Sequence, residues 1–154
     1  MIRRPPRSTL SSSSAASDVY KRQFLPSSRI TDCRVVNSII SEGSIIAGST
    51  IEESIIGIRS VIKQGATIRR SIIMGADFYE SEATDANAGN SQEIGIGENS
   101  VVVNAIVDKN VRIGAGCRIV NARNVRNETT PLYTISDGIV VIPKDTVIPP
   151  GTVI

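Results

Sequence analysis

The sequence predicts an all-β fold, a left-handed parallel β-helix of hexapeptide repeats with about five coils. The first observation is that Ser-Ile-Ile recurs at Ser38, Ser54 and Ser71, at a spacing of 16 and then 17 residues, with one more Ser-Ile-Ile at Ser44 between the first two. Second, the apolar anchors within one copy lie about six residues apart, which fits neither a 3.6-residue helix nor the alternation of an amphipathic strand. Third, Ile and Val dominate the apolar residues, and only 3% of all residues are aromatic.

The first coils are expected within residues 38–75. Residues 48–51 correspond to residues 65–68, 17 positions later, and residues 44–46 correspond to residues 60–62, 16 positions later. Short β-branched triplets broken by Gly, Ser and Asn favour short strands with tight turns, and three of each close a triangular coil. Stacking would place each anchor about 4.8 Å from its copy. We expect the Ile pair of each copy to fill the same corner of the column in every coil.

The pattern resumes in residues 105–119 and 141–154, which align without a gap and place Ile148 at the position of Ile113. Residues 76–95 and 120–138 interrupt the coils and are polar and rich in Asn, Gly or Pro. They are predicted to be two loops that project from the column. Because a short solenoid ends in unpaired strand edges, we expect a cap, a preceding domain or another subunit at its ends.

The N-terminal tail, residues 1–23, differs from the rest of the chain. It is rich in Arg and Ser and has five basic side chains against one acidic. That composition is typical of an organelle transit peptide. The string also resembles translated sequencing-adapter read-through, and we favour this interpretation because it joins directly onto what looks like a late part of a protein. Either interpretation predicts disorder and gives no information on localisation. The β-helix domain is therefore taken to be residues 24–154.

The composition excludes several kinds of site. The chain has no histidine, which excludes Ser-His-Asp and Cys-His nucleophile pairs and most zinc sites. Two classes of β-helix enzyme, the hexapeptide acyltransferases and the γ-class carbonic anhydrases, depend on histidine and are excluded with them. The 17 basic and 15 acidic side chains give no reason to expect nucleic acid as a partner. No apolar run is long enough to span a membrane. Cys33 and Cys117 are expected to be reduced and packed.

Four strings resemble one known family: 74–80 (MGADFYE), 94–100 (IGIGENS), 105–114 (AIVDKNVRIG) and 136–154 (SDGIVVIPKDTVIPPGTVI). Together they resemble the C-terminal domain of ADP-glucose pyrophosphorylases, also called glucose-1-phosphate adenylyltransferases, of the plant, algal and cyanobacterial type. The resemblance covers residues 24–154. GDP-mannose pyrophosphorylases and related enzymes also end in a β-helix, and a stand-alone assembly module is a further alternative. The first and last strings favour the ADP-glucose enzyme.

The resemblance implies a parent enzyme that forms ADP-glucose and pyrophosphate from ATP and glucose 1-phosphate with Mg²⁺, for starch or glycogen synthesis. Its catalysis belongs to an N-terminal nucleotidyltransferase domain with a Gly-rich phosphate loop, and no such loop opens this chain. We therefore expect no catalytic residue, no metal site and no cofactor in this chain, and no transferase activity of the chain alone.

The expected partners also follow from the resemblance. They are the catalytic domain of the same protein, the other subunits of a tetramer, and two anionic effectors, the activator 3-phosphoglycerate and the inhibitor inorganic phosphate. Neither nucleic acid nor a membrane is expected. The expected location is a plastid in a plant or green alga and the cytoplasm in a cyanobacterium.

Lys109, in "IVDKN", and Lys144, in "VIPKD", match the effector-binding lysines of that family. The internal alignment independently gives them the same position in successive coils. Two ammonium groups roughly 5–10 Å apart repel by about 2–3 kcal/mol at an effective dielectric of 20, and a phosphate between them would turn this cost into an attraction. The alternative is that both lysines extend into water. Pro143 departs from the aliphatic residue usual in the family, and the arginines of the site belong to the other domain. We therefore expect weak effector binding by this chain.

Other polar residues are given structural roles. Asp77, Tyr79 and Glu80 begin a projecting loop and have no base beside them, so a contact with another domain is favoured over catalysis. Asn104 and Asn110 are expected in left-handed turns, because asparagine tolerates that backbone geometry.

Overall fold

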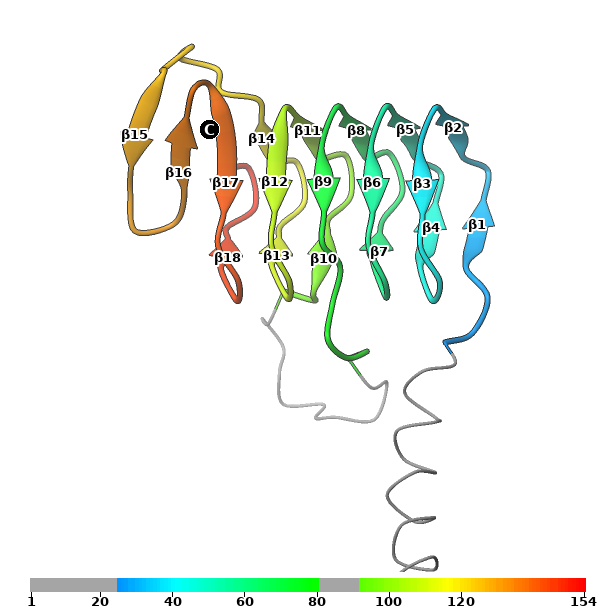
Figure 1. The fold of residues 1–154 in the computed structure, drawn as a ribbon. Coiled ribbons are helices and arrows are strands. Elements are labelled where there is room, and N and C mark those ends of the chain that lie inside the picture. Colours follow the sequence, from blue (N-terminus) through cyan, green and yellow to red (C-terminus); the bar gives the residue numbers. More distant parts are fainter. Residues whose placement is uncertain (1–24, 81–91) are drawn as a thin grey trace, which may run out of the picture.

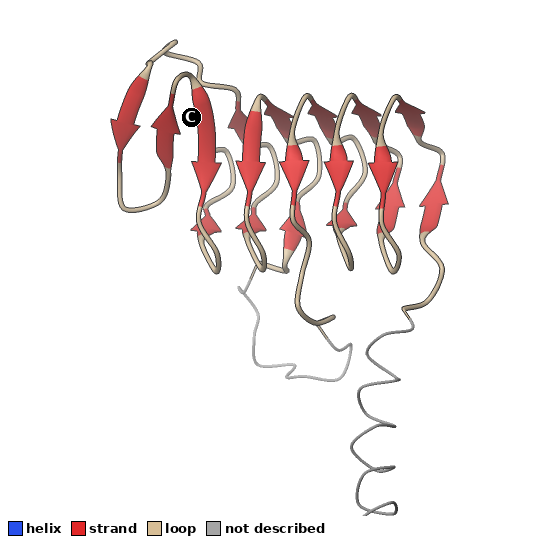
Figure 2. Ribbon diagram, in the orientation of Figure 1, coloured by secondary structure: helices blue, strands red, loops and turns tan. Residues whose placement is uncertain are grey.

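The computed structural model describes residues 25–80 and 92–154, which form a three-sided column of stacked coils (Figure 1). Every regular element in these residues is a strand (Figure 2). Within the same residues, no helix has the length and apolar character needed to cross a membrane. The predicted tail and the middle of the first predicted loop, residues 81–91, lie outside the described residues.

Each side of the column is one sheet. Within each coil, the first strand belongs to sheet A, the second to sheet B and the third to sheet C. Sheet A contains β1 (Arg29–Thr31), β4 (Ile45–Ala47), β7 (Val61–Ile62), β10 (Gly95–Ile96), β13 (Arg112–Ile113) and β18 (Val147–Ile148). Sheet B contains β2 (Arg34–Val36), β5 (Thr50–Glu52), β8 (Thr67–Arg69), β11 (Val101–Val103) and β14 (Arg118–Ile119). Sheet C contains β3 (Ile39–Ile40), β6 (Ile55–Ile56), β9 (Ile72–Ile73), β12 (Ala105–Val107) and β17 (Ile139–Ile142), followed by β16 (Thr134–Ser136) and β15 (Asn127–Thr129).

The strand register confirms the repeat alignment. Ile39 pairs with Ile55 and Ile55 with Ile72, all in parallel strands. In the later coils, Ile106 pairs with Val141. Five coils supply a strand to each sheet, and β18 with the bridge from Arg118 to Val153 begins a sixth, so the expected number of coils is confirmed.

Only one isoleucine of each Ser-Ile-Ile pair faces the interior of the column. Ile56 is 0% and Ile73 is 5% exposed, whereas Ile55 is 44% and Ile72 is 39% exposed. Successive residues of a strand point to opposite faces, so two adjacent isoleucines cannot both face the core. The expectation that the whole pair fills the corner is therefore wrong. The second isoleucine fills it, and the first lies on the outer face of sheet C.

The serine that precedes each of these isoleucine pairs also has a structural role. The serine hydroxyls form a ladder of hydrogen bonds from one coil to the next. The Ser54 N–H donates to the Ser38 hydroxyl (3.1 Å), and the Ser71 N–H donates to the Ser54 hydroxyl (3.2 Å). The Ala105 N–H then donates to the Ser71 hydroxyl (3.2 Å). Ser54 and Ser71 are each 3% exposed, so these hydroxyls satisfy backbone N–H groups that water does not reach.

Replacing Ser54 by alanine is expected to lower the free energy of unfolding by about 1–3 kcal/mol, because the buried Ser71 N–H loses its acceptor. Urea unfolding followed by circular dichroism measures the change. Ser136, an exposed strand residue, provides the control, and its replacement by alanine should cost no more than about 0.5 kcal/mol. Equal effects of the two substitutions would contradict the role of the ladder.

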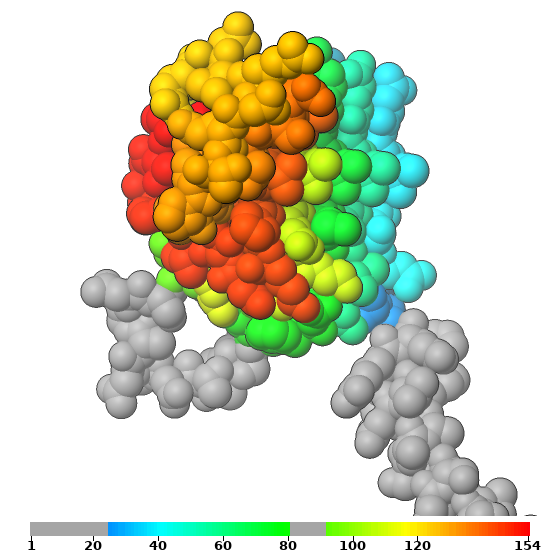
Figure 3. Space-filling view, turned by 60° about the vertical axis from the view of Figure 1, so that its left-hand side comes forward, coloured from blue at the N-terminus to red at the C-terminus, as the bar shows by residue number. Residues whose placement is uncertain are grey.

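Residues 120–138 leave the coil as predicted, but the expectation of a loop is wrong for part of them. β16 pairs antiparallel with β17, and β15 pairs antiparallel with β16, so the two strands extend sheet C as a hairpin. The hairpin lies at the C-terminal end of the column (Figure 3). Ile135 packs into the core at 3% exposure, and the Tyr133 hydroxyl donates to Glu128 (3.1 Å). Its strands are short and mostly polar, which hides them from a search for apolar periodicity.

Candidate anion site

The predicted effector lysines lie on the turns that join sheet C to sheet A, here called the C–A corner (the turns after β12 and β17). Each lysine follows its strand by two residues, since β12 ends at Val107 and β17 at Ile142, and these two residues pair in register. The Asp145 N–H donates to the Lys109 carbonyl (3.1 Å), which stacks one turn on the other. The structure therefore brings Lys109 and Lys144 together, on adjacent coils at the same position.

One carboxylate lies between the two ammonium groups. Lys109 Nζ is 3.1 Å from Asp77 Oδ1, and Lys144 Nζ is 2.8 Å from Asp77 Oδ2. The side chains of Asp77, Lys109 and Lys144 are 38%, 39% and 49% exposed, so the cluster is open to solvent on one side. The two lysines thus do not extend separately into water, as the alternative from the sequence would require.

Asn110 holds Asp77 in this position. Its side-chain N–H donates to Asp77 Oδ2 (3.1 Å), and its side-chain oxygen accepts the backbone N–H of Asp77 (2.8 Å). Asn110 is 6% exposed, and its φ of 59° confirms the expected left-handed turn, as does the φ of 52° at Asn104. Asn110 therefore turns the chain and also anchors the carboxylate.

Asp77 reaches the corner because the first insertion leaves the column there. The Ala76 N–H donates to the Ile58 carbonyl (2.9 Å), and the Asn110 N–H donates to the Gly75 carbonyl (3.1 Å), so residues 75 and 76 still belong to the coil. Asp77 is the first residue beyond it. This places its side chain one coil away from Lys109, on the same corner.

Tyr79 and Glu80 tie the start of the insertion to the column. The Tyr79 hydroxyl donates to the Gly43 carbonyl (2.8 Å), and Glu80 forms an ion pair with Arg112. Glu80 also accepts the N–H of Ile94 (2.8 Å), where the insertion returns to the coil. Asp77, Tyr79 and Glu80 thus all bind this chain's own column, and their expected contact with another domain stays a prediction.

The electrostatics of the corner centre on Asp77. The Lys144 ammonium, with Lys109 and Asn110 as further donors, holds the pKa of the Asp77 carboxyl well below its usual range. The same contact raises the pKa of Lys144, and Asp145 and Asp108 add smaller contributions from nearby. Three carboxylates therefore lie near two ammonium groups, but only Asp77 bridges both lysines.

Asp77 is expected to stay ionised at pH 4, where about half of ordinary aspartates are protonated. Its pKa is lower in the folded chain, so its contribution to stability is complete above the ordinary aspartate pKa and is lost as the pH falls through the folded value. The carboxyl ¹³C shift of Asp77, followed by NMR from neutral to acid pH, measures this. Lys144→Ala should raise the midpoint toward the ordinary value, and an ordinary midpoint in the unmodified chain would contradict the ion pairs.

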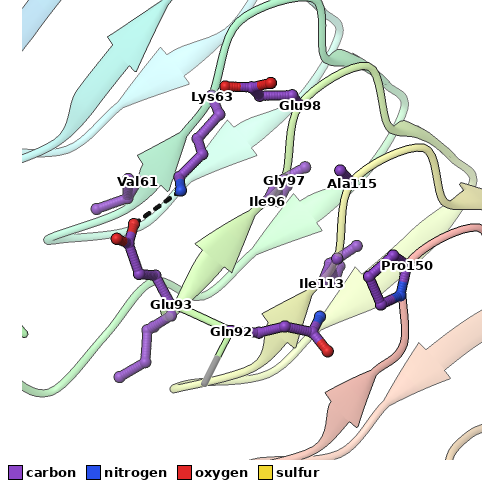
Figure 4. A pocket seen from close by; sticks show the side chains of 12 residues that line it. Val61, Lys63, Gln92, Glu93, Ile96, Gly97, Glu98, Ile113, Ala115 and Pro150 are labelled. Atoms are coloured by element: carbon purple, nitrogen blue, oxygen red, sulfur yellow. Dashed lines mark ion pairs between the residues drawn. The ribbon is translucent and has the colours of Figure 1, made fainter. Parts of the chain in front are cut away.

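One hollow on sheet A is a weaker candidate. It has a volume of about 150 Å³, lies beside the ion pair between Lys63 and Glu93 (2.8 Å) and is lined in part by Gln92 (Figure 4). It is smaller than the roughly 300 Å³ at which pockets for small molecules begin. Among the described residues, no three His, Cys, Asp or Glu side chains are grouped so that they could hold a metal ion. Cys117 is buried and Cys33 half-buried, both as free thiols.

Sequence reasoning found the two lysines but missed Asp77 and Asn110 as their neighbours. A signal was present, because aligning Ile73 with Val107 places Gly75 at the position of Lys109. That alignment puts Ala76 level with Asn110, so Asp77 must begin the insertion directly beside the lysine turns. The conformation of its side chain was not readable from spacing.

Two comparisons with known proteins agree on one family. The model described as the GLGC left-handed parallel beta-helix domain matches residues 23–153. The chain is also 44% identical over 137 residues to a protein of Triticum aestivum called glucose-1-phosphate adenylyltransferase small subunit, chloroplastic/amyloplastic. The matched region is 86% of this chain but 29% of that relative, so the chain spans less than a third of the relative's length. Of the alternatives left open by the sequence, both findings favour the ADP-glucose enzyme over the GDP-mannose enzyme.

Proposed function

The chain belongs to the family of the GLGC left-handed parallel beta-helix domain, and from this premise we propose that it is the effector-binding and assembly domain of a glucose-1-phosphate adenylyltransferase. The observation that carries the proposal is the convergence of Lys109 and Lys144 on a single carboxylate. Two ammonium groups that meet on one anionic group have the geometry to bridge two oxygens of a phosphate.

The proposed ligands are phosphate-bearing anions, 3-phosphoglycerate as the activator and inorganic phosphate as the inhibitor. Lysine binds phosphate as a point charge, so two lysines from adjacent coils fix an anion without a shaped pocket. Asp108 and Asp145 near the lysines reduce the positive potential of the corner. Affinity in this chain alone is therefore weak, and further cations from a nucleotidyltransferase domain complete the site.

The assembly role is supported by the outer face of sheet C. Ile39, Ile55 and Ile72 stack in register there and are 63%, 44% and 39% exposed. A continuous exposed apolar row is typical of an interaction surface. We assign it to the nucleotidyltransferase domain of the same polypeptide, because the relative that this chain matches is more than three times as long as the matched region. Other subunits of a tetramer meet the remaining surfaces.

The wider role follows from the same proposal. The parent protein forms ADP-glucose for starch synthesis in a plastid, and the Mg²⁺ that the reaction needs is bound outside this chain, in the nucleotidyltransferase domain.

Sedimentation equilibrium tests whether the exposed row of Ile39, Ile55 and Ile72 contacts the nucleotidyltransferase domain rather than a second copy of this chain. We expect the chain alone to be a monomer, and a dimer disrupted by Ile39→Ser with Ile55→Ser would assign the row to a second copy instead.

Titration of the chain with inorganic phosphate and with 3-phosphoglycerate, followed by NMR of the lysine side chains, tests the anion site. Both ligands should shift the signals of Lys109 and Lys144, and Lys109→Ala or Lys144→Ala should weaken binding by about fivefold or more, because each removes one of two bridging charges. Lys63→Ala is the matched control, since Lys63 follows β7 and is paired with Glu93, away from the two lysine turns. In an enzyme that carries this domain, the same substitutions at Lys109 or Lys144 should weaken 3-phosphoglycerate activation more than substrate binding.

A further inference from the structure

Asp77 occupies the space that the proposed function gives to an anion. Each of its carboxylate oxygens is held by one lysine, at 3.1 Å and 2.8 Å, and Asn110 donates to the second oxygen at 3.1 Å. These are the positions at which two oxygens of a phosphate would meet the same ammonium groups. The proposed function uses the Asp77 carboxylate only to show that the lysines converge and gives it no role in ligand binding, although it bridges both lysines in the described structure.

We propose that Asp77 is an internal competitor of the anion, so that a ligand binds Lys109 and Lys144 only by displacing the Asp77 carboxylate. This inference rests on the proposed function, because it assumes that the lysines bind an anion. The apparent affinity of such a site is its intrinsic affinity reduced by the fraction of molecules in which the lysines are free. Asp77 therefore sets how much phosphate the corner needs before it responds.

Displacement requires only a small movement. The Asp77 side chain is 38% exposed, so rotation about its first side-chain torsion can move the carboxylate toward solvent. The backbone N–H of Asp77 bonds to Asn110 independently of that rotation, so the start of the insertion stays anchored. Asp108, by contrast, accepts the backbone N–H of Lys109 (2.7 Å) and does not bridge the lysines.

The competition with Asp77 also favours ligands that carry more than one negative charge. Asp77 offers the lysines one negative charge, so a monovalent carboxylate brings no electrostatic gain over the group it must displace. A phosphate dianion brings one more charge and further oxygens to accept the remaining ammonium donors. The corner therefore favours phosphate-bearing ligands over simple carboxylates, although neither lysine distinguishes the two classes by itself.

The test compares phosphate binding by the full chain and by Asp77→Asn, which keeps the size and the acceptor oxygen but removes the charge. At a mildly alkaline pH, NMR titration with inorganic phosphate should show an apparent dissociation constant about five- to tenfold lower in the variant, as expected for loss of two partly exposed ion pairs. Asp137→Asn is the matched control. Asp137 pairs with Arg126 (3.3 Å) and precedes β17, whereas Lys144 follows β17, so the two residues lie at opposite ends of that strand. Asp137→Asn removes the same charge from the protein and should change the constant by less than about twofold.

The outcomes separate this inference from the proposed function. Equal phosphate affinity of the unmodified chain and Asp77→Asn, with both weakened by Lys144→Ala, would leave the anion site in place and overturn the competition. Weaker binding by Asp77→Asn would also overturn it, because Asp77 would then organise the lysines rather than block them. Absence of phosphate binding in both forms overturns the anion site and the competition together. Movement of the Asp77 carboxyl ¹³C signal on addition of phosphate to the unmodified chain supports displacement directly.

Discussion

Replacing Ile56 by alanine is expected to lower the free energy of unfolding by about 2–5 kcal/mol. Ile56 is 0% exposed and stacks between Ile40 and Ile73 in the interior of the column. Removing three carbon atoms there leaves a cavity, and the coils above and below cannot collapse into it because their hydrogen bonds fix the spacing between strands. Urea unfolding monitored by circular dichroism gives the change.

Ile55 is the control for this prediction, since it is the same residue type in the same strand. It is 44% exposed on the outer face, so Ile55→Ala should cost about 1 kcal/mol or less, mainly through strand propensity. Similar losses for the two substitutions would mean that the inward and outward assignments of the Ile pair are wrong.

Gly75→Ala is expected to destabilise the chain by about 2–5 kcal/mol, the combined effect of backbone strain and overpacking. Gly75 has a φ of 91°, and an added Cβ would lie 2.0 Å from the Ile58 carbonyl oxygen. That oxygen accepts the Ala76 N–H, so the clash pushes apart two coils at the root of the insertion. We also expect the variant to lose the close approach of Asp77 to the lysines, because Asp77 is only two residues further along the chain.

Gly116→Ala separates the two causes. Gly116 has a φ of 67°, but an added Cβ there meets nothing within 4 Å. It therefore carries the cost of the left-handed conformation alone, about 1–2 kcal/mol. Differential scanning calorimetry of the two variants measures the difference, and a Gly116 variant as unstable as the Gly75 variant would show that the contact with the Ile58 carbonyl contributes nothing.

The sequence allowed the coils and their register to be predicted because a β-helix repeats one local environment many times. Each copy of Ser-Ile-Ile repeats the same evidence, and the alignment that joined Ile106 to Val141 also placed Lys109 beside Lys144. Side chains on the turns follow from the same register. This is why the two lysines were predictable although they are 35 residues apart.

Features that occur once were not predictable in this way. The position of the Asp77 carboxylate depends on where the insertion leaves the coil and on its hydrogen bonds to Asn110. The hairpin of β15 and β16 has no copy elsewhere in the described residues to align with, and its strands Asn127–Thr129 and Thr134–Ser136 are mostly polar. The outward turn of the first isoleucine in each pair was predictable from strand geometry alone, but repetition suggested a shared interior role.

The antiparallel hairpin has a consequence for how long such a column can grow. Stacked parallel coils present the same edge after every turn, so in principle another molecule could continue the stack, as strands do in fibrils. In sheet C, β17 is followed by β16 and then by the edge strand β15, whereas sheets A and B end at β18 and β14. A growing stack needs all three sides at once, but the hairpin leaves sheet C two strands longer than sheet B, so the three edges do not end level and one more coil cannot pair with all of them.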